Sequence, residues 1–125
     1  MTDPKTIVIV DDEPDTANML AEMMRLSGFN ILISYGGQTA TRLIAEAKPD
    51  VVILDLVMPD LPGLDVLAWM RSTESLAHIP VIIVSASQLP SDEKASLDGG
   101  ASLFLPKPVS YGELKKAVDL LLLSN

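Results

Sequence analysis

Short apolar runs alternate along the chain with longer segments in which apolar residues recur every three or four positions. The runs are continuous and rich in β-branched residues, which is typical of strands buried on both faces of a parallel sheet. They cover residues 6–10, 31–33, 51–55, 81–84 and 103–105. We therefore predict five strands at these positions.

A helix is predicted after each strand. Four of these helices have an apolar face defined by residues at helical spacing. The faces consist of Ala17, Leu20, Ala21 and Met24; of Ala40, Leu43, Ile44 and Ala47; of Leu64, Val66, Leu67 and Met70; and of Leu114, Ala117, Val118, Leu121 and Leu122. The remaining helix is short and acidic, and is predicted to open at Ser91 and end at Gly99. Ser110 and Glu113 have the spacing of a capping box at the start of the last helix.

Five strand–helix units in succession predict an α/β fold, with a mostly parallel sheet and helices on both faces. The 125 residues are enough for one hydrophobic core. The predicted connections are short and no stretch resembles a linker. Residues 1–125 are therefore expected to form a single domain.

The composition narrows the possible classes of function. The chain contains no cysteine, which removes disulfides, thiolate catalysis and cysteine-ligated zinc, and which fits a cytoplasmic protein. No apolar run approaches the roughly 18 residues of a membrane-spanning helix. The formal net charge of −8 disfavours direct binding to nucleic acid or to anionic membranes. It allows a bound cation or a basic partner.

Polar side chains gather where four of the predicted strands end. Asp11 and Asp12 follow the first strand, and Asp55 ends the third. Ser85 follows the fourth strand, and Lys107 lies just beyond the fifth. The carboxyl ends of parallel strands meet at one edge of the sheet, where sites form in open α/β folds. These side chains are therefore expected to lie close together.

This group of residues has the chemistry of a phosphoryl-transfer site. Two carboxylates about 4 Å apart repel each other by about 4 kcal/mol at an effective dielectric of about 20. Mg²⁺ would offset this repulsion, since it prefers carboxylate and carbonyl oxygens and often bridges to phosphate. Lys107 adds a positive charge, and Ser85 adds a hydroxyl that can donate to an oxyanion. Asp55 would then be the nucleophile that forms an aspartyl-phosphate.

Each residue also has an ordinary structural explanation. An aspartate after a strand is often a turn or helix cap, and a strand-end serine or lysine is often simply solvated. His78 is the single histidine and is expected at the surface. Met19, Met23 and Met24 are expected to pack in the core and on a helix surface. The conjunction of four strand ends with complementary chemistry favours the functional interpretation.

Over essentially its whole length the chain resembles the receiver domain of the two-component response regulator family. Four motifs of the family have counterparts in this chain. They are the acidic pair after the first strand, the phosphoacceptor strand and loop, the Thr/Ser followed by Ala, and the switch aromatic with the site lysine. These are Val10-Asp11-Asp12-Glu13-Pro14, Asp55-Leu56-Val57-Met58-Pro59 with Gly63, Val84-Ser85-Ala86, and Phe104-Leu105-Pro106-Lys107-Pro108. The resemblance implies a doubly wound, flavodoxin-like sheet of five parallel strands in the order 2-1-3-4-5. It also implies a phosphorylation-dependent signalling switch that promotes only its own phosphorylation and dephosphorylation, not an enzyme with an external substrate.

The resemblance assigns roles around the phosphoacceptor. Asp55 is expected to accept a phosphoryl group from a phosphohistidine of a histidine kinase or a histidine phosphotransfer protein. Asp12, Asp55 and the backbone carbonyl of Val57 are expected to bind Mg²⁺. Asp11 is expected to act mainly through a metal-bound water.

The resemblance also assigns roles to the last two strands. Ser85 and Lys107 are expected to hold the phosphoryl oxygens, and Phe104 to turn inward when Ser85 moves toward the phosphate. Ser85 stands where the family more often has threonine, so a methyl group that helps to fix the rotamer is lost. Phe104 stands where tyrosine is frequent, so it cannot hydrogen-bond outward. A cis Lys107–Pro108 bond is also expected, because Lys107 must point back into the site.

Two expectations concern regulation. In the family, the side chains two positions after the phosphoacceptor and two after the Thr/Ser flank the approach of the hydrolytic water. Val57 and Ser87 occupy these positions and neither is suited to orient a water, so a long-lived phosphoryl group is expected. Leu120 and Leu123 lie off the core face of the last helix. They are either scattered surface apolar residues or part of a surface of the fourth helix, fifth strand and fifth helix, which the family uses for homodimers and downstream proteins.

Three other interpretations were compared with this one. A haloacid-dehalogenase-like phosphatase needs a second acid two residues after the nucleophile, where this chain has Val57. A flavodoxin-like protein needs a phosphate-binding loop after the first strand, where Asp11 and Asp12 would repel a phosphate. A receiver domain that is never phosphorylated would not need the complete set of site residues that this chain carries.

Overall fold

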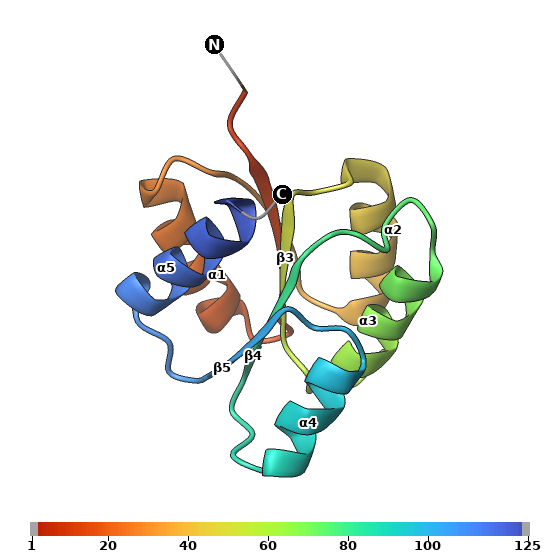
Figure 1. Cartoon of the computed structure of the whole chain (residues 1–125). Coiled ribbons are helices and arrows are strands. Elements are labelled where there is room, and N and C mark those ends of the chain that lie inside the picture. Colours follow the sequence, from red (N-terminus) through yellow and green to blue (C-terminus); the bar gives the residue numbers. More distant parts are fainter. Residues whose placement is uncertain (1–2, 124–125) are drawn as a thin grey trace.

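Five parallel strands form one sheet in the order β2-β1-β3-β4-β5 (Figure 1). The structure, a computed structural model, describes residues 3–123. The strands are β1 (Thr6–Val10), β2 (Asn30–Ser34), β3 (Val51–Leu54), β4 (Val81–Ser85) and β5 (Leu103–Pro106). The predicted fold class and strand order are confirmed.

Helices cover both faces of the sheet. They are α1 (Pro14–Leu26), α2 (Gly37–Ala47), α3 (Gly63–Ser72), α4 (Pro90–Asp98) and α5 (Tyr111–Leu123). In Figure 1, α1 and α5 lie on one side of the sheet, and α2 and α3 lie on the other with α4 below them. This two-layer cover explains why the central strands are apolar throughout, since both of their faces are buried.

The core consists of two apolar clusters, one on each side of the sheet. Alternate residues of a strand point to opposite faces, so Ile7 and Ile9 pack toward α1 and α5 while Val8 and Val10 pack toward α2 and α3. All four of these side chains are buried. The sheet is therefore a rigid support for the residues that follow the carboxyl ends of its strands.

The local predictions hold with small changes at the ends of elements. The capping box of α5 forms as predicted: the amide of Glu113 donates to Ser110 Oγ and the amide of Ser110 donates to Glu113 Oε1, both at 3.1 Å. The helix predicted to open at Ser91 begins at Pro90, whose fixed φ suits the first helical position. α2 begins at Gly37, ahead of the first residue of its predicted apolar face, Ala40.

Several single residues lie as the sequence predicts. His78 is exposed. Met24 is buried while Met19 is exposed, so the methionines of α1 divide between core and surface. Leu121 and Leu122 are partly buried against the core cluster beside α5. Among residues 3–123, no helix is long and apolar enough to cross a membrane.

Candidate phosphoryl-transfer site

The register of the strands places two aspartates side by side. In the β1–β3 pair, Val10 lies opposite Leu54, so the residues that follow, Asp11 and Asp55, leave the sheet together. The amide of Asp11 donates to the carbonyl of Ser34 at 3.1 Å, and the amide of Asp55 donates to the carbonyl of Val10 at 2.9 Å. Both residues therefore continue the backbone hydrogen bonding of the sheet, which fixes where their carboxylates begin.

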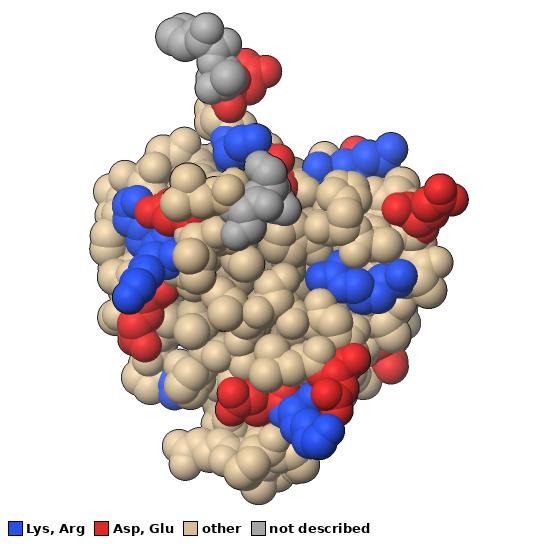
Figure 2. All heavy atoms as spheres, in the orientation of Figure 1, with Lys and Arg blue, Asp and Glu red and all other residues tan. Residues whose placement is uncertain are grey.

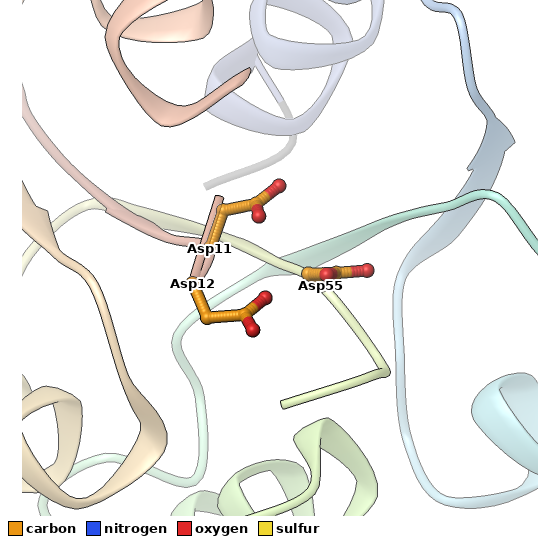
Figure 3. A group of neighbouring side chains, drawn as sticks. All are labelled: Asp11, Asp12 and Asp55. Atoms are coloured by element: carbon orange, nitrogen blue, oxygen red, sulfur yellow. The ribbon is translucent and has the colours of Figure 1, made fainter. Parts of the chain in front are cut away.

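Asp12 completes a group of three carboxylates. One carboxylate oxygen from each of Asp11, Asp12 and Asp55 lies within 4.8 Å of the others. Figure 3 shows Asp11 and Asp12 at the end of one strand and Asp55 at the end of the next, with the three side chains directed toward the same side. Asp11 and Asp55 are buried, whereas Asp12 is partly exposed. A set of oxygen donors that reaches the surface in this way suits a hard divalent cation.

Lys107 reaches the same carboxylates from the end of β5. Its Nζ lies 2.9 Å from Asp11 Oδ2 and 3.7 Å from Asp55 Oδ2. The amide of Lys107 donates to the carbonyl of Ser85 at 2.9 Å, and the Lys107–Pro108 bond is cis, as predicted. The lysine thus neutralises part of the negative charge.

The ionisable groups perturb one another's pKa values. Burial raises the pKa of Asp55, and the charge of Asp11 acts in the same direction; the charge of Lys107 and the amides of Leu56 and Val57 oppose this rise without cancelling it. Burial lowers the pKa of Lys107, but the hydrogen bond to Asp11 and the nearby carboxylate charges outweigh it and raise this pKa. One lysine therefore leaves an excess of negative charge, which a cation would relieve.

In Mg²⁺-free solution, Asp55→Asn should stabilise the folded protein by about 1 kcal/mol at neutral pH. The pKa of Asp55 is higher in the folded than in the unfolded chain, so ionisation disfavours folding. This penalty is absent below the unfolded value of 3.8 and develops as the pH rises through the folded pKa. Denaturant unfolding of both proteins across a pH series measures it. Asp3→Asn is the control, because it removes an exposed carboxylate. An equal gain in stability in this variant would show that the effect comes from the net charge of the chain and not from the surroundings of Asp55.

Ser85 is fully buried at the end of β4 and is tied to the start of α4. Its Oγ accepts the amide N–H of Ser87 at 3.1 Å. The Oγ of Ser87 accepts the amide N–H of Leu89 at 3.2 Å and donates to the carboxylate of Asp92, in the first turn of α4. Asp92 was not among the predicted site residues, because no spacing pattern indicates which serine an acidic helix start will face.

The loop after β3 holds Val57 at the surface and approaches two helices closely. The side chain of Val57 is 71% exposed. A Cβ added to Gly63 would lie 2.1 Å from the carbonyl oxygen of Asp55, so only glycine lets α3 begin this close to the end of β3. Asp60 accepts hydrogen bonds from amides at the start of α2, a contact that the sequence analysis did not predict.

Phe104 lies in the edge strand β5. Its side chain is partly buried and packs against the core cluster on the side of α2 and α3. Ile83 of β4 is its partner in the register, so Phe104 stands close to the strand that ends in Ser85. The structure thus brings together four of the predicted site residues, Asp11, Asp12, Asp55 and Lys107. Ser85 is bonded to the backbone of Lys107, and Phe104 lies in the strand next to Ser85.

The sequence of residues 7–119 matches the response regulator receiver domain. The chain belongs to this family. The polar-differentiation response regulator DivK of Brucella anthropi is 32% identical over 107 residues, which cover 86% of this chain and 87% of DivK. The signal receiver domain of a histidine kinase from Syntrophus aciditrophicus superposes with a TM-score of 0.89 at 31% identity, covering 96% of this chain and 91% of that one. Receiver domains are signalling proteins, and the phosphatase and flavodoxin alternatives are therefore rejected.

The three clustered carboxylates offer this chain a candidate site for a divalent cation. The receiver domain of sensor histidine kinase PA1611 from Pseudomonas aeruginosa PAO1 has a magnesium ion coordinated in its active-site cleft. It superposes with a TM-score of 0.89 at 24% identity, covering 96% of this chain and 98% of that one. In this receiver domain, the three clustered carboxylates supply oxygen donors of the type that Mg²⁺ prefers.

Proposed function

We propose that residues 1–125 form one receiver domain that accepts a phosphoryl group on Asp55 in a Mg²⁺-dependent reaction. The meeting of Asp55 with two further carboxylates and Lys107 at one edge of the sheet carries this proposal. Asp55 is held by the sheet and lies next to the positive charge of Lys107, which can neutralise an incoming phosphoryl group. It also belongs to a carboxylate cluster that suits a metal ion. These are the requirements of phosphoryl transfer, which depends on positioning and charge neutralisation.

Each site residue has a proposed part in the transfer. Asp12, Asp55 and the carbonyl of Val57 would hold Mg²⁺, and Asp11 would act through a metal-bound water. When bound, Mg²⁺ would neutralise charge on the phosphoryl oxygens. An oxygen of Asp55 attacks the phosphorus, the bond from phosphorus to the donor's histidine nitrogen breaks, and the histidine leaves with the electron pair. Lys107 exchanges its contact with Asp55 for a phosphoryl oxygen.

The signal would leave the site through Ser85. The hydroxyl of Ser85 accepts the amide N–H of Ser87, which leaves its own proton to be donated to a phosphoryl oxygen as Ser85 moves toward Asp55. Phe104, already partly buried in the neighbouring strand, would turn inward as Ser85 moves. The start of α4 would follow, because Ser87 also contacts Asp92.

The phosphoryl donor is proposed to be a histidine kinase or a histidine phosphotransfer protein in the cytoplasm. Membership of the receiver family supports this donor class. The proposal is tested by incubating the purified protein with phosphoramidate, a small nitrogen–phosphorus donor, with and without Mg²⁺. Addition of one phosphoryl group only in the presence of Mg²⁺, read by intact mass, supports it. Equal modification after removal of Mg²⁺ with a chelator would contradict it.

A surface formed by α4, β5 and α5 is proposed to bind a second copy or a downstream protein. In the view of Figure 2, the middle of the molecule carries no charged side chains, and acidic and basic ones lie around it. Leu97 on α4 is 44% exposed and Leu120 on α5 is 55% exposed. Exposed apolar residues are also common where nothing binds, so a variant must distinguish the two interpretations.

Leu120→Glu should weaken self-association of the beryllofluoride-treated protein about fivefold or more, as expected for an apolar residue inside an interface. Sedimentation velocity with and without beryllofluoride measures this. Leu26→Glu is the matched control, because Leu26 is 74% exposed but lies on α1, outside the proposed surface. If both variants associate as the unmodified sequence does, Leu120 is a scattered surface residue.

A further inference from the structure

The loop between β3 and α3 is joined to a helix that contributes no residue to the site. Asp60 Oδ1 accepts the amide N–H of Gly37, and Asp60 Oδ2 accepts that of Gln38, both at 3.0 Å. These N–H groups lie in the first turn of α2, where amides have no partner within the helix. The N-cap residue of α2 is Gly36, which has no side chain to supply one. A carboxylate from a distant part of the chain therefore caps α2.

The contact between the loop and α2 requires glycine at positions 36 and 37. A Cβ added to Gly36 would lie 2.9 Å from Asp60 Oδ2, and one added to Gly37 would lie 2.4 Å from the carbonyl oxygen of Leu61. Side chains at these positions would push the loop away from the helix. The Gly36-Gly37 pair thus permits close docking of the loop onto α2, in addition to marking the start of the helix.

The hydrogen bonds from α2 favour the ionised form of Asp60. The amides of Gln38 and Gly37 lower the pKa of Asp60 below its ordinary value. The positive end of the α2 dipole acts in the same sense, since it favours negative charge at the first turn. Asp60 is therefore a charged anchor at neutral pH.

Three anchors hold the loop, and Val57 lies between two of them. The first is Asp55, which is bonded into the sheet. The second is Asp60, and the third is Gly63, whose amide donates to the carbonyl of Leu56 at 2.9 Å. Val57 itself is 71% exposed, so packing of its own side chain does little to fix its backbone. Its position depends on the anchors on either side.

We propose that Asp60 is a positioning residue for Mg²⁺ binding: by bonding the loop to α2, it holds the backbone carbonyl of Val57 where the metal needs it. This inference rests on the proposed function, in which that carbonyl is a ligand. Groups that orient the ligands of a metal commonly control its affinity by about 10- to 100-fold. Asp60 would act in this way although it touches neither the metal nor the phosphoryl group.

Asp60→Ala should weaken Mg²⁺ binding roughly tenfold, measured by isothermal titration calorimetry. Asp60→Asn keeps one oxygen that accepts an N–H and should fall between Asp60→Ala and the unmodified sequence. The matched control is Thr39→Ala, because the hydroxyl of Thr39 bonds to the carbonyl of Gly36 and to Ser34 Oγ at the same end of α2, without contacting the loop. Thr39→Ala should lower stability and leave Mg²⁺ affinity unchanged.

A second readout needs no metal. In Mg²⁺-free protein, the amides of Gly37 and Gln38 should exchange with solvent faster in Asp60→Ala, because they lose their acceptor. Unchanged Mg²⁺ affinity in Asp60→Ala, or an equal loss in Thr39→Ala, would overturn the positioning role. Failure of the unmodified sequence to bind Mg²⁺ would instead refute the proposed function itself, so the two failures are distinguishable. If Asp60→Ala does not fold, the Asp60→Asn comparison decides.

Discussion

Asp55→Asn should abolish phosphorylation by phosphoramidate, and Asp12→Ala should weaken Mg²⁺ binding by at least about tenfold. The asparagine amide is not a nucleophile toward phosphorus, and the two other carboxylates of the cluster, Asp11 and Asp12, are proposed to act on the metal. Asp12 is the most exposed of the three carboxylates, so its removal should affect the metal more than the fold. Intact mass reports phosphorylation, and calorimetry reports Mg²⁺ affinity.

The two variants should differ in their response to added Mg²⁺. A high Mg²⁺ concentration should restore phosphorylation of Asp12→Ala, because the nucleophile is intact and the metal is merely bound more weakly. It should not restore phosphorylation of Asp55→Asn. Full phosphorylation of Asp55→Asn would show that another residue is the acceptor, and would favour the interpretation of this chain as a receiver domain that does not use Asp55.

Val57→Asn combined with Ser87→Glu should shorten the lifetime of the phosphoryl group about tenfold or more. Hydrolysis needs a water in line with the bond between Asp55 and phosphorus, on the exposed side of the phosphoryl group. Val57 is 71% exposed and its branched side chain cannot hydrogen-bond a water. The hydroxyl of Ser87 is already engaged with Asp92 and the amide of Leu89. The unmodified sequence should therefore retain its phosphoryl group for longer.

Release of inorganic phosphate from the purified phosphoprotein in Mg²⁺ measures this lifetime. Ser87→Ala is an informative control, because it removes the contact with Asp92 without supplying a group that orients water. It should leave the lifetime close to that of the unmodified sequence. An unchanged or longer lifetime in the double variant would refute the account of Val57 and Ser87.

The fold and the central site could be predicted because they follow from the periodicity of the chain. Buried parallel strands must be apolar on both faces, and the residue after each strand must emerge at one edge of the sheet. Asp11, Asp55 and Lys107 therefore had to meet once the five strand–helix units were recognised, and the structure joins them by two ion pairs and backbone hydrogen bonds. The capping box of α5 was predictable for a related reason, since its partners are only three residues apart.

The contacts that could not be predicted join residues far apart in the chain or in loops without periodicity. Asp60 caps a helix that begins more than twenty residues before it. The sequence around Gly36 does not show that the cap of this helix comes from a distant side chain. The bond from Ser87 to Asp92 depends on how the loop before α4 turns, which a Pro-containing acidic stretch does not fix. α4 begins at Pro90, just before the predicted start at Ser91, because the fixed φ of proline suits the first helical position.

The most direct test of the central claim is to locate the phosphoryl group chemically. The protein is phosphorylated with phosphoramidate in Mg²⁺, reduced with borohydride, which converts an aspartyl-phosphate to homoserine, and digested for tandem mass spectrometry. Our account predicts homoserine at position 55 alone, and none when Mg²⁺ is removed before phosphorylation. Homoserine at position 11 or 12, or at position 55 without Mg²⁺, would contradict it.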